Sequence, residues 1–333
     1  MMVPLKGMRR PGRRPYLRTT ERTIPMRRRT FMKTTAATAA VHVVGRHVLG
    51  GAGGTAPSDK LAIAGVGVGG QGGGVLKSVD DQAIVALCDV DSKKAGGTFK
   101  RYPKAEPFKD YRRMLDKRKD VDAVVIATPD HMHAPVTLAC LRSGKHVYTE
   151  KPMAHSIEEA RVMTRAARET GLVTQMGNNG HGGEGLRLTR EYIQAGAIGK
   201  VREVHCWSDR PGKWWPQPVE PPTAGQPVPE HLDWNLWLGC ARARPYHPAY
   251  HPFKWRAWFD FGTGALGDMA VHNMDPAFYA LDLGAPVAVE AKTSALPRAT
   301  YPAWQIVTYE FAPGKMHGPL KVIWYDGGKM PPR

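Results

Sequence analysis

The chain has 333 residues, of which 42% are hydrophobic and 23% charged, and its formal net charge at pH 7 is +17. This length allows two domains with a core each, and no apolar run of about eighteen residues predicts a membrane-spanning helix. Residues 1–33 hold eleven Lys and Arg against one acidic residue, so the basic excess belongs mainly to the N-terminus and nucleic-acid binding is not expected.

The N-terminal segment has the pattern of a twin-arginine export signal. Residues 28–33, RRTFMK, precede a weakly hydrophobic stretch rich in alanine. We therefore assign residues 1–55 to a signal and linker, and expect the twin-arginine export machinery to carry the protein to the periplasm. The alternative is a disordered basic arm and a cytoplasmic protein, because His42, Arg46 and His47 interrupt the hydrophobic stretch.

Residues 61–74, LAIAGVGVGGQGGG, predict a buried strand that runs into a glycine-rich turn and a helix. Gly67, Gly69 and Gly72 have G-x-G-x-x-G spacing, with Gly70 among them. Such glycines permit a tight turn, close backbone approach to a pyrophosphate and close helix packing, and the helix N-terminus favours phosphate. A plain flexible turn is the alternative interpretation.

The next predicted strand, residues 83–88, ends at Asp89, twenty-two positions after Gly67. An acidic residue at about this distance binds the ribose hydroxyls of adenosine, and its charge disfavours the 2′-phosphate of NADP. The pattern therefore predicts NAD as the cofactor. Lys93 and Lys94 lie close enough in the sequence to leave NADP open.

Strands and helices then alternate up to residue 177. This order predicts a parallel, doubly wound sheet, and we assign residues 56–177 to an NAD(P)-binding Rossmann domain. Ser156 and Glu159 form a capping box that predicts a helix start. The carboxyl ends of the strands should line one crevice. Further strands are expected at 122–127, 145–149 and 172–176, and helices at 91–101, 111–115, 134–143 and 156–170.

From residue 178 onward the composition changes, since all nine tryptophans follow residue 206. Prolines crowd residues 211–229, which predicts a long loop. We expect residues 178–333 to form an α+β domain with an open, mostly antiparallel sheet that binds substrate and forms oligomers. Its strands are predicted at 200–207, 304–311 and 320–325, and one helix at 264–283.

Lys151 lies in the sequence Glu150-Lys151-Pro152, directly after a predicted strand. Pro152 restricts Lys151 to an extended conformation, which suits an amine held at a fixed angle. The alternative is an ordinary surface lysine at a turn.

Asp268 and His272 are four residues apart and share one face of a predicted helix. An imidazole transfers protons near neutral pH, and a carboxylate can orient it. The alternative is a surface pair that caps a helix.

Residues 246–258 combine aromatic and histidine residues. Their aromatic rings can stack on the apolar face of a sugar, and Arg256 can bind hydroxyls or a carboxylate. Core packing or a subunit interface is the alternative. A metal site is not expected, because the prolines beside His247 and His251 deny this pair a helical geometry.

Five motifs together resemble the Gfo/Idh/MocA oxidoreductases, typified by glucose–fructose oxidoreductase and inositol dehydrogenase. They are the glycine turn, ALCDVD at 86–91, VVIATPDHMHAP at 124–135, HVYTEKPMAHSIEEA at 146–160 and FGTGALGDMAVHNMD at 261–275. The resemblance implies a Rossmann domain followed by an open sheet that builds homo-oligomers. It also implies a C-terminal truncation, since the second domain of this family normally runs further. Stretches such as DWNLWLG resemble an exported subgroup abundant in planctomycete-type bacteria.

The resemblance also implies the site residues. The catalytic group falls on Lys151, Asp268 and His272. Taking the motifs together, we expect the cofactor to be bound by Gly67, Gly69, Gly70, Gly72, Asp89, Thr128, Pro129, His133, Glu150 and Lys151, and the substrate by Asn178, Tyr246, Trp255 and Arg256.

The expected function is that of an NAD(P)-dependent oxidoreductase that transfers a hydride between nicotinamide and a sugar, polyol or related carbohydrate. One alternative is a non-redox, NAD-dependent glycosidase or epimerase that oxidises its sugar transiently. Another is a non-catalytic sugar-binding relative.

Overall fold

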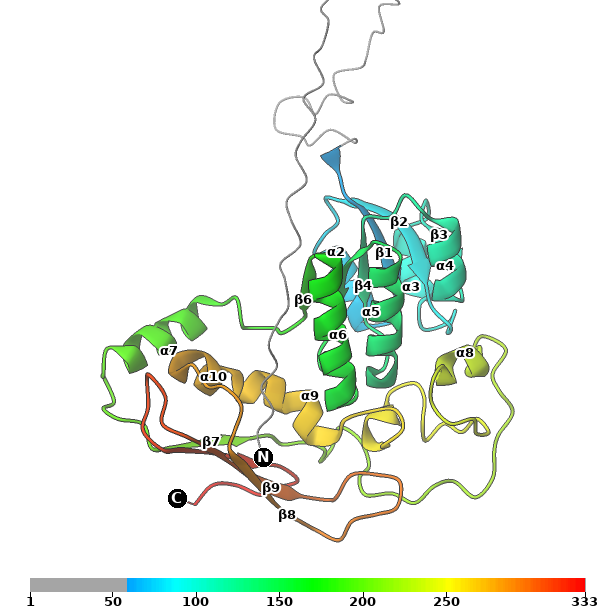
Figure 1. The fold of residues 1–333 in the computed structure, drawn as a ribbon. Helices are drawn as coiled ribbons and strands as arrows, with labels where there is room; N and C mark the ends of the chain where they lie inside the picture. Colours follow the sequence, from blue (N-terminus) through cyan, green and yellow to red (C-terminus); the bar gives the residue numbers. More distant parts are fainter. Residues whose placement is uncertain (1–58, 333) are drawn as a thin grey trace, which may run out of the picture. The chain divides into compact units, whose positions relative to one another are not determined.

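A six-stranded parallel sheet forms the first part of the described chain, residues 59–332 of this computed structural model (Figure 1). The strand order is β3-β2-β1-β4-β5-β6, so the chain starts in the middle and winds outward in both directions. This order confirms the predicted doubly wound sheet, whose ligand-binding crevice opens where the winding reverses, beside β1 and β4. The strands are β1 (Ala62–Val66), β2 (Ala83–Cys88), β3 (Glu106–Phe108), β4 (Ala123–Ile126), β5 (His146–Thr149) and β6 (Thr174–Met176).

Helices cover both faces of this sheet, because successive strand residues point to opposite sides. Ala64 and Val66 of β1 pack with the helices α4, α5 and α6, whereas Ile63 packs with α2 and α3. The capping box predicted at Ser156 is present at the start of α6. The helices are α2 (Gln71–Lys77), α3 (Gly96–Arg101), α4 (Tyr111–Lys117), α5 (His133–Arg142) and α6 (Ile157–Thr170).

The helix predicted at 91–101 starts five residues late. The Oδ1 atom of Asp91 accepts hydrogen bonds from the backbone N–H groups of Lys93 and Lys94, which shapes a turn in place of the first helical residues. Aspartate competes in this way with the helical hydrogen-bond pattern.

A four-stranded sheet with the order β7-β10-β9-β8 follows in the second part of the chain. Two of its three strand pairs are antiparallel, and β10 pairs with β7 in parallel, as predicted for a mostly antiparallel sheet. The helices α7, α9 and α10 lie over one face (Figure 1), where Met274 and Leu281 pack against Trp324. The strands are β7 (Glu203–Trp207), β8 (Ala288–Thr293), β9 (Gln305–Phe311) and β10 (Leu320–Tyr325), and the helices are α7 (Glu184–Gln194), α9 (Gly264–Asn273) and α10 (Asp275–Leu281).

The single helix predicted at 264–283 is wrong, because the chain forms two helices that meet at Met274. Pro276 lies in the first turn of α10. Its ring has no N–H to donate and clashes with the carbonyl group four residues earlier, so α9 cannot continue through it. Helix α7 and strand β8 had no counterpart in the prediction.

A core of aromatic rings supports the long connection between β7 and α9. Trp234 and Trp237 stack with ring centroids 4.7 Å apart, and Trp237 meets Phe261 edge to face at 4.8 Å. Trp234 and Trp237 belong to the short helix α8 (Trp234–Leu238), and the 3₁₀ helix η3 (Lys254–Ala257) follows.

Backbone hydrogen bonds join this connection to the carboxyl end of the parallel sheet. Ser92 N–H donates to the carbonyl group of His231, and Asp233 N–H donates to that of Val90, each at 2.9 Å. The loop after β2 and the second part of the chain therefore meet at one edge of the crevice.

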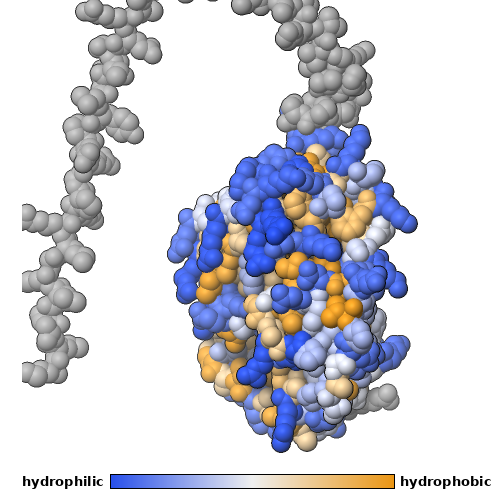
Figure 2. Space-filling view, turned by 90° about the vertical axis from the view of Figure 1, so that its right-hand side faces the viewer, coloured by the Kyte–Doolittle hydropathy of each residue, from blue (hydrophilic) through white to orange (hydrophobic). Residues whose placement is uncertain are grey.

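The predicted signal, residues 28–33 within 1–55, lies outside the described residues. None of the helices in residues 59–332 has the length and apolar character needed to cross a membrane. Figure 2 shows one side of the molecule, on which hydrophobic side chains lie in separate patches among hydrophilic ones.

The two glycines Gly72 and Gly74 of α2 give a matched test of the packing between α2 and β1. A Cβ atom on Gly72 would lie 2.3 Å from the carbonyl oxygen of Gly67, whereas one on Gly74 would meet nothing within 4 Å. We expect Gly72→Ala to lower the free energy of unfolding by about 1–3 kcal/mol, because backbone must move. Gly74→Ala should raise it by about 0.5–1 kcal/mol, because alanine loses less entropy in a helix. Urea unfolding followed by circular dichroism measures both, and equal effects would contradict this packing.

Candidate active site

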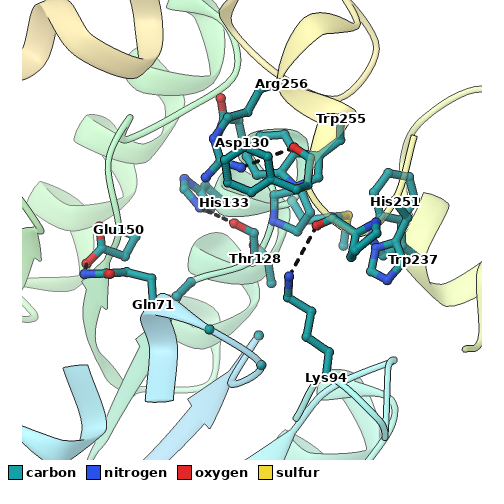
Figure 3. Close-up of a pocket in the computed structure, with 18 of the residues that line it drawn as sticks. Gln71, Lys94, Thr128, Asp130, His133, Glu150, Trp237, His251, Trp255 and Arg256 are labelled. Carbon is teal, nitrogen blue, oxygen red and sulfur yellow. Dashed lines mark hydrogen bonds between the residues drawn. The ribbon is translucent and has the colours of Figure 1, made fainter. Parts of the chain in front are cut away.

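A cavity of about 760 Å³ lies at the carboxyl ends of the parallel strands. Its walls come from the β1–α2 turn, the ends of β2, β4 and β5, and, in the second part of the chain, Asn179 and four longer segments (Figure 3). Its volume lies in the range of about 300–1,000 Å³ that is typical of ligand and cofactor sites. The lining segments of the second part are 210–215, 236–237, 251–256 and 268–272.

The glycine turn forms one end of the cavity. Gly67 has φ +77°, and a Cβ atom there would lie 2.7 Å from the backbone of Ala127. Gly67, Gly69 and Gly70 line the cavity, whereas Gly72 lies outside the lining and permits close packing of α2. A backbone cradle without side chains, next to a helix N-terminus, fits the pyrophosphate of a dinucleotide.

Asp89 anchors this turn from the end of β2. Its Oδ2 atom accepts a hydrogen bond from Gly69 N–H at 2.8 Å, and its Oδ1 atom accepts one from Asp91 N–H at 2.9 Å. Burial raises the pKa of Asp89, and these two N–H groups oppose the rise. Lys94 also lines this end and donates from Nζ to the carbonyl group of Pro252 at 3.4 Å (Figure 3). Asp89, whose charge disfavours NADP, and Lys94, whose charge favours NADP, therefore both border the cavity.

His133 joins two loops that border the cavity. Its Nδ1 atom lies 2.6 Å from the carbonyl oxygen of Pro152, and its Nε2 atom lies 2.8 Å from that of Thr128 (Figure 3). Because both ring nitrogens face backbone groups, His133 positions these loops, while Thr128 and Pro129 line the cavity beside it. Asp130 follows, buried, and accepts a hydrogen bond from the Thr263 hydroxyl at 2.7 Å.

Lys151 points into the cavity from the end of β5. Its Nζ atom donates to Asp268 Oδ1 at 2.8 Å and to the Asp268 carbonyl group at 2.9 Å. An ammonium group has three N–H donors, so one remains for a ligand. The neighbouring Glu150 is buried and accepts from Gln71 Nε2 at 3.4 Å and from Lys151 N–H at 3.2 Å.

Asp268, on α9, binds cations from both parts of the chain. Arg210 donates to its Oδ2 atom, and Arg256 Nε lies 3.6 Å from Oδ1, the atom that Lys151 also contacts. Burial by itself would raise the pKa of Asp268, but Lys151, Arg256 and Arg210 together hold it below its ordinary value. Asp268 is therefore an ionised carboxylate at neutral pH.

His272 lies one turn further along α9 and lines the same cavity. Burial and the positive charge of Lys151 lower the pKa of His272. The imidazole is thus neutral at neutral pH and can accept a proton. The sequence spacing pairs Asp268 with His272, whereas the structure places Lys151 in direct contact with Asp268.

Two of the four predicted substrate residues lie elsewhere. Trp255 and Arg256 line the cavity, but Tyr246 packs its ring edge against Trp234, with centroids 5.3 Å apart, and lies outside the lining. Asn178 donates from Nδ2 to the carbonyl group of Val271 at 3.0 Å, and its neighbour Asn179 lines the cavity instead.

Sequence analysis missed Arg210, whose guanidinium group stacks over the Trp214 ring at 4.4 Å. It follows the end of β7 by three residues, so the rule that pointed to Lys151, a polar residue just after a strand, could have found it. Lys109 and Asn179 follow the ends of β3 and β6 and carry the same signal, whereas Trp215, Trp237 and Met269 of the lining do not.

Comparison with known protein families supports this assignment of the two parts. Residues 60–178 match the model of an oxidoreductase family with an NAD-binding Rossmann fold. Residues 211–319 match the C-terminal alpha/beta domain of the same family. The two models together match more than half of the chain.

Individual relatives align over part of the chain. Levoglucosan dehydrogenase of Pseudarthrobacter phenanthrenivorans is 27% identical over 193 residues, which cover 58% of this chain and 41% of that protein. Inositol 2-dehydrogenase of Rubrobacter xylanophilus is 36% identical over 155 residues, 45% of this chain and 44% of that protein. The matches thus span less than half the length of these curated relatives.

Solved structures show the same fold. The WlbA dehydrogenase of Bordetella pertussis, solved with NADH and UDP-GlcNAcA, is similar with a TM-score of 0.57 and 21% identity over 79% of this chain and 71% of that chain. Because two models of one family match the two parts of the chain in order, the chain belongs to the Gfo/Idh/MocA family of oxidoreductases.

Proposed function

We propose that this chain carries the active site of an NAD(P)-dependent oxidoreductase that interconverts a hydroxyl and a carbonyl group on a sugar, polyol or related carbohydrate. The proposal rests on the contact between Lys151 Nζ and Asp268 Oδ1. It brings an ammonium group with one free N–H donor to the same cavity as the glycine turn and the neutral His272. The relatives named as dehydrogenases of levoglucosan and inositol support a carbohydrate substrate.

The residues of the first part hold the cofactor. The backbone of Gly67, Gly69 and Gly70 receives the pyrophosphate, Asp89 binds the adenosine ribose, and the loops at Thr128 and Glu150 border the nicotinamide side. Bound NAD(P) supplies the group that accepts or returns the hydride. Asp89 favours NAD, and Lys94 beside it leaves NADP as the second cofactor; comparing the affinities of the protein for both tests this preference.

Lys151 and His272 act on the substrate oxygen. Lys151 donates its remaining N–H to that oxygen and stabilises negative charge that develops on it. His272, neutral at neutral pH, accepts the hydroxyl proton in the oxidation direction and returns it in the reduction direction. Asp268 holds the Lys151 ammonium group through two hydrogen bonds, so the donor is already oriented when substrate enters.

Lys151→Met tests this role with little change in side-chain length. We expect turnover to fall by a factor of about 100 or more, because the charge stabilisation at the oxygen is lost, while NAD affinity stays the same. The measurement is nicotinamide absorbance with a panel of sugars and polyols that includes inositol and levoglucosan. Lys119→Met, at a lysine whose side chain is 73% exposed, is the matched control and should keep full turnover. Full turnover in Lys151→Met would refute the assignment.

The same experiment separates redox from non-redox chemistry. Consumption of a sugar without net change in the nicotinamide absorbance would contradict the proposed net oxidation and favour transient oxidation followed by elimination or epimerisation. A protein that binds NAD and a sugar without converting it would be a binding protein.

The pKa of His272 provides a second prediction, on pH dependence. Burial and Lys151 lower it below its ordinary value of about 6.5, so the oxidation rate should rise with pH and reach half its maximum below that value. Removing the Lys151 charge favours the imidazolium form, so Lys151→Met should raise the pKa of His272. Titration of the histidine signals by NMR, with His272→Asn for assignment, measures the shift. The control Lys119→Met should leave the pKa of His272 unchanged. If Lys151→Met also leaves it unchanged, the coupling between Lys151 and His272 is contradicted.

We also propose that the protein is exported by the twin-arginine pathway, as a member of the exported subgroup, and that it forms homo-oligomers through the second sheet. The RRTFMK pattern at residues 28–33 supports export; replacing both arginines with lysine should leave the protein in the cytoplasm.

Exposed apolar side chains on and beside the outer strands of the second sheet support assembly into homo-oligomers, and the molar mass in solution tests this assembly. These side chains are Trp207, Val287 and Val289.

A further inference from the structure

Three cationic side chains surround one carboxylate on the wall of the cavity. Lys151, Arg210 and Arg256 all lie within 4 Å of Asp268. Their side chains are 19%, 17% and 23% exposed, so solvent screens their charges only in part. The Asp268 carboxylate neutralises one of these three positive charges.

Asp130 is the other acidic group that faces this cluster. It lies near Arg256 from the first part of the chain, and its buried carboxyl accepts the Thr263 hydroxyl. Burial raises the pKa of Asp130, which disfavours its ionised form. Three cationic side chains therefore share the carboxylate of Asp268. Glu150, next to Lys151 in the chain, accepts from Gln71 Nε2 and from Lys151 N–H, and Asp89 accepts from Gly69 N–H.

Arg210 has a hydrogen-bond donor that no described residue satisfies. Its Nη1 atom contacts Asp268 and Met269, whereas its Nε atom is buried and has no hydrogen-bond partner within residues 59–332. Its guanidinium group lies over the Trp214 ring, which limits its movement. Because Nε is closed to solvent, the terminal nitrogens of Arg210 are the atoms that could reach a ligand in the cavity.

Arg256 is held in a similar way on the opposite wall. Its guanidinium group lies between the rings of Phe253 and Trp255, 4.4 Å and 4.2 Å from their centroids. Its Nη1 atom donates to the Phe253 carbonyl group at 3.4 Å, and its Nε atom faces Asp268. Both guanidinium groups therefore have fixed orientations on the wall of the cavity before any ligand enters.

We propose that Arg210 and Arg256 bind a carboxylate of the substrate, so that the substrate is a sugar acid rather than a neutral sugar. Guanidinium groups present paired N–H donors that match the two oxygens of a carboxylate. This inference rests on the proposed oxidoreductase function and specifies its substrate class.

The test is calorimetric binding of four probes of similar size to the full protein saturated with NADH, which cannot accept a hydride from them. These are D-glucuronate, D-gluconate, D-glucose and the methyl ester of D-glucuronate. We expect at least one of the two acids to bind about tenfold or more tightly than both neutral probes, because a charged hydrogen-bonded pair is lost in the latter. Arg210→Gln and Arg256→Gln should each remove most of this difference.

The control is Arg165→Gln, on the surface of α6, where the side chain is 61% exposed; it should keep the difference. Arg210→Lys keeps the charge and loses the paired donors, and it should retain only part of the affinity for the acid. Equal or tighter binding of the neutral probes by the wild-type protein would overturn the proposal, and this outcome does not depend on any variant folding. Tighter binding of glucose 6-phosphate than of either acid would also overturn it. Because binding is measured without turnover, a failure of the oxidoreductase function would show separately, as absent nicotinamide reduction.

Discussion

The ion-pair cluster at Asp268 is the interaction on which the rest of this structure depends. One ionised carboxylate on α9 receives Lys151 from the end of a parallel strand and Arg210 from the end of β7. It thereby joins both sheets at a single point inside the cavity. A buried carboxylate without these partners would be costly, because desolvation would not be offset. The same cations that keep Asp268 ionised lower the pKa of His272, so the cluster sets the protonation of two groups at once.

The cavity needs the second part of the chain as much as it needs the Rossmann domain. The aromatic core around Trp237 gives the long connection a rigid base, although that connection has little regular structure. Its backbone then pairs with the loop after β2 through Ser92 and Asp233, and His251 donates to or accepts from Asp91 across 2.8 Å. As a result, a segment some 140 residues away in sequence borders the adenosine side of the cavity. This explains how one continuous cavity holds both a cofactor cradle and a cluster for substrate.

The sequence predicted roles best where local geometry alone decides them. The glycine spacing, the capping box at Ser156 and the acid at the end of β2 all depend on the backbone within a few residues, and each is found where it was expected. Predictions failed where a partner far away in sequence decided the contact. Tyr246 and Trp255 belong to the same aromatic stretch, yet one packs on Trp234 and the other lines the cavity. His133 does line the cavity, with its two ring nitrogens against backbone carbonyl groups.

The sequence by itself determined the doubly wound sheet, the cofactor-binding turn and the positions of Lys151, Asp268 and His272. It could do so because strand and helix periodicity and strand-end placement are local properties, and because parallel strands bring their carboxyl ends to one edge. Only the tertiary structure decided which charges meet. Arg210, Arg256 and Lys151 are separated by dozens of residues, and no sequence spacing states that they share one carboxylate. Electrostatic contacts act over a few ångströms in space regardless of distance along the chain, so this cluster of three cations around one carboxylate appears only once the chain is folded.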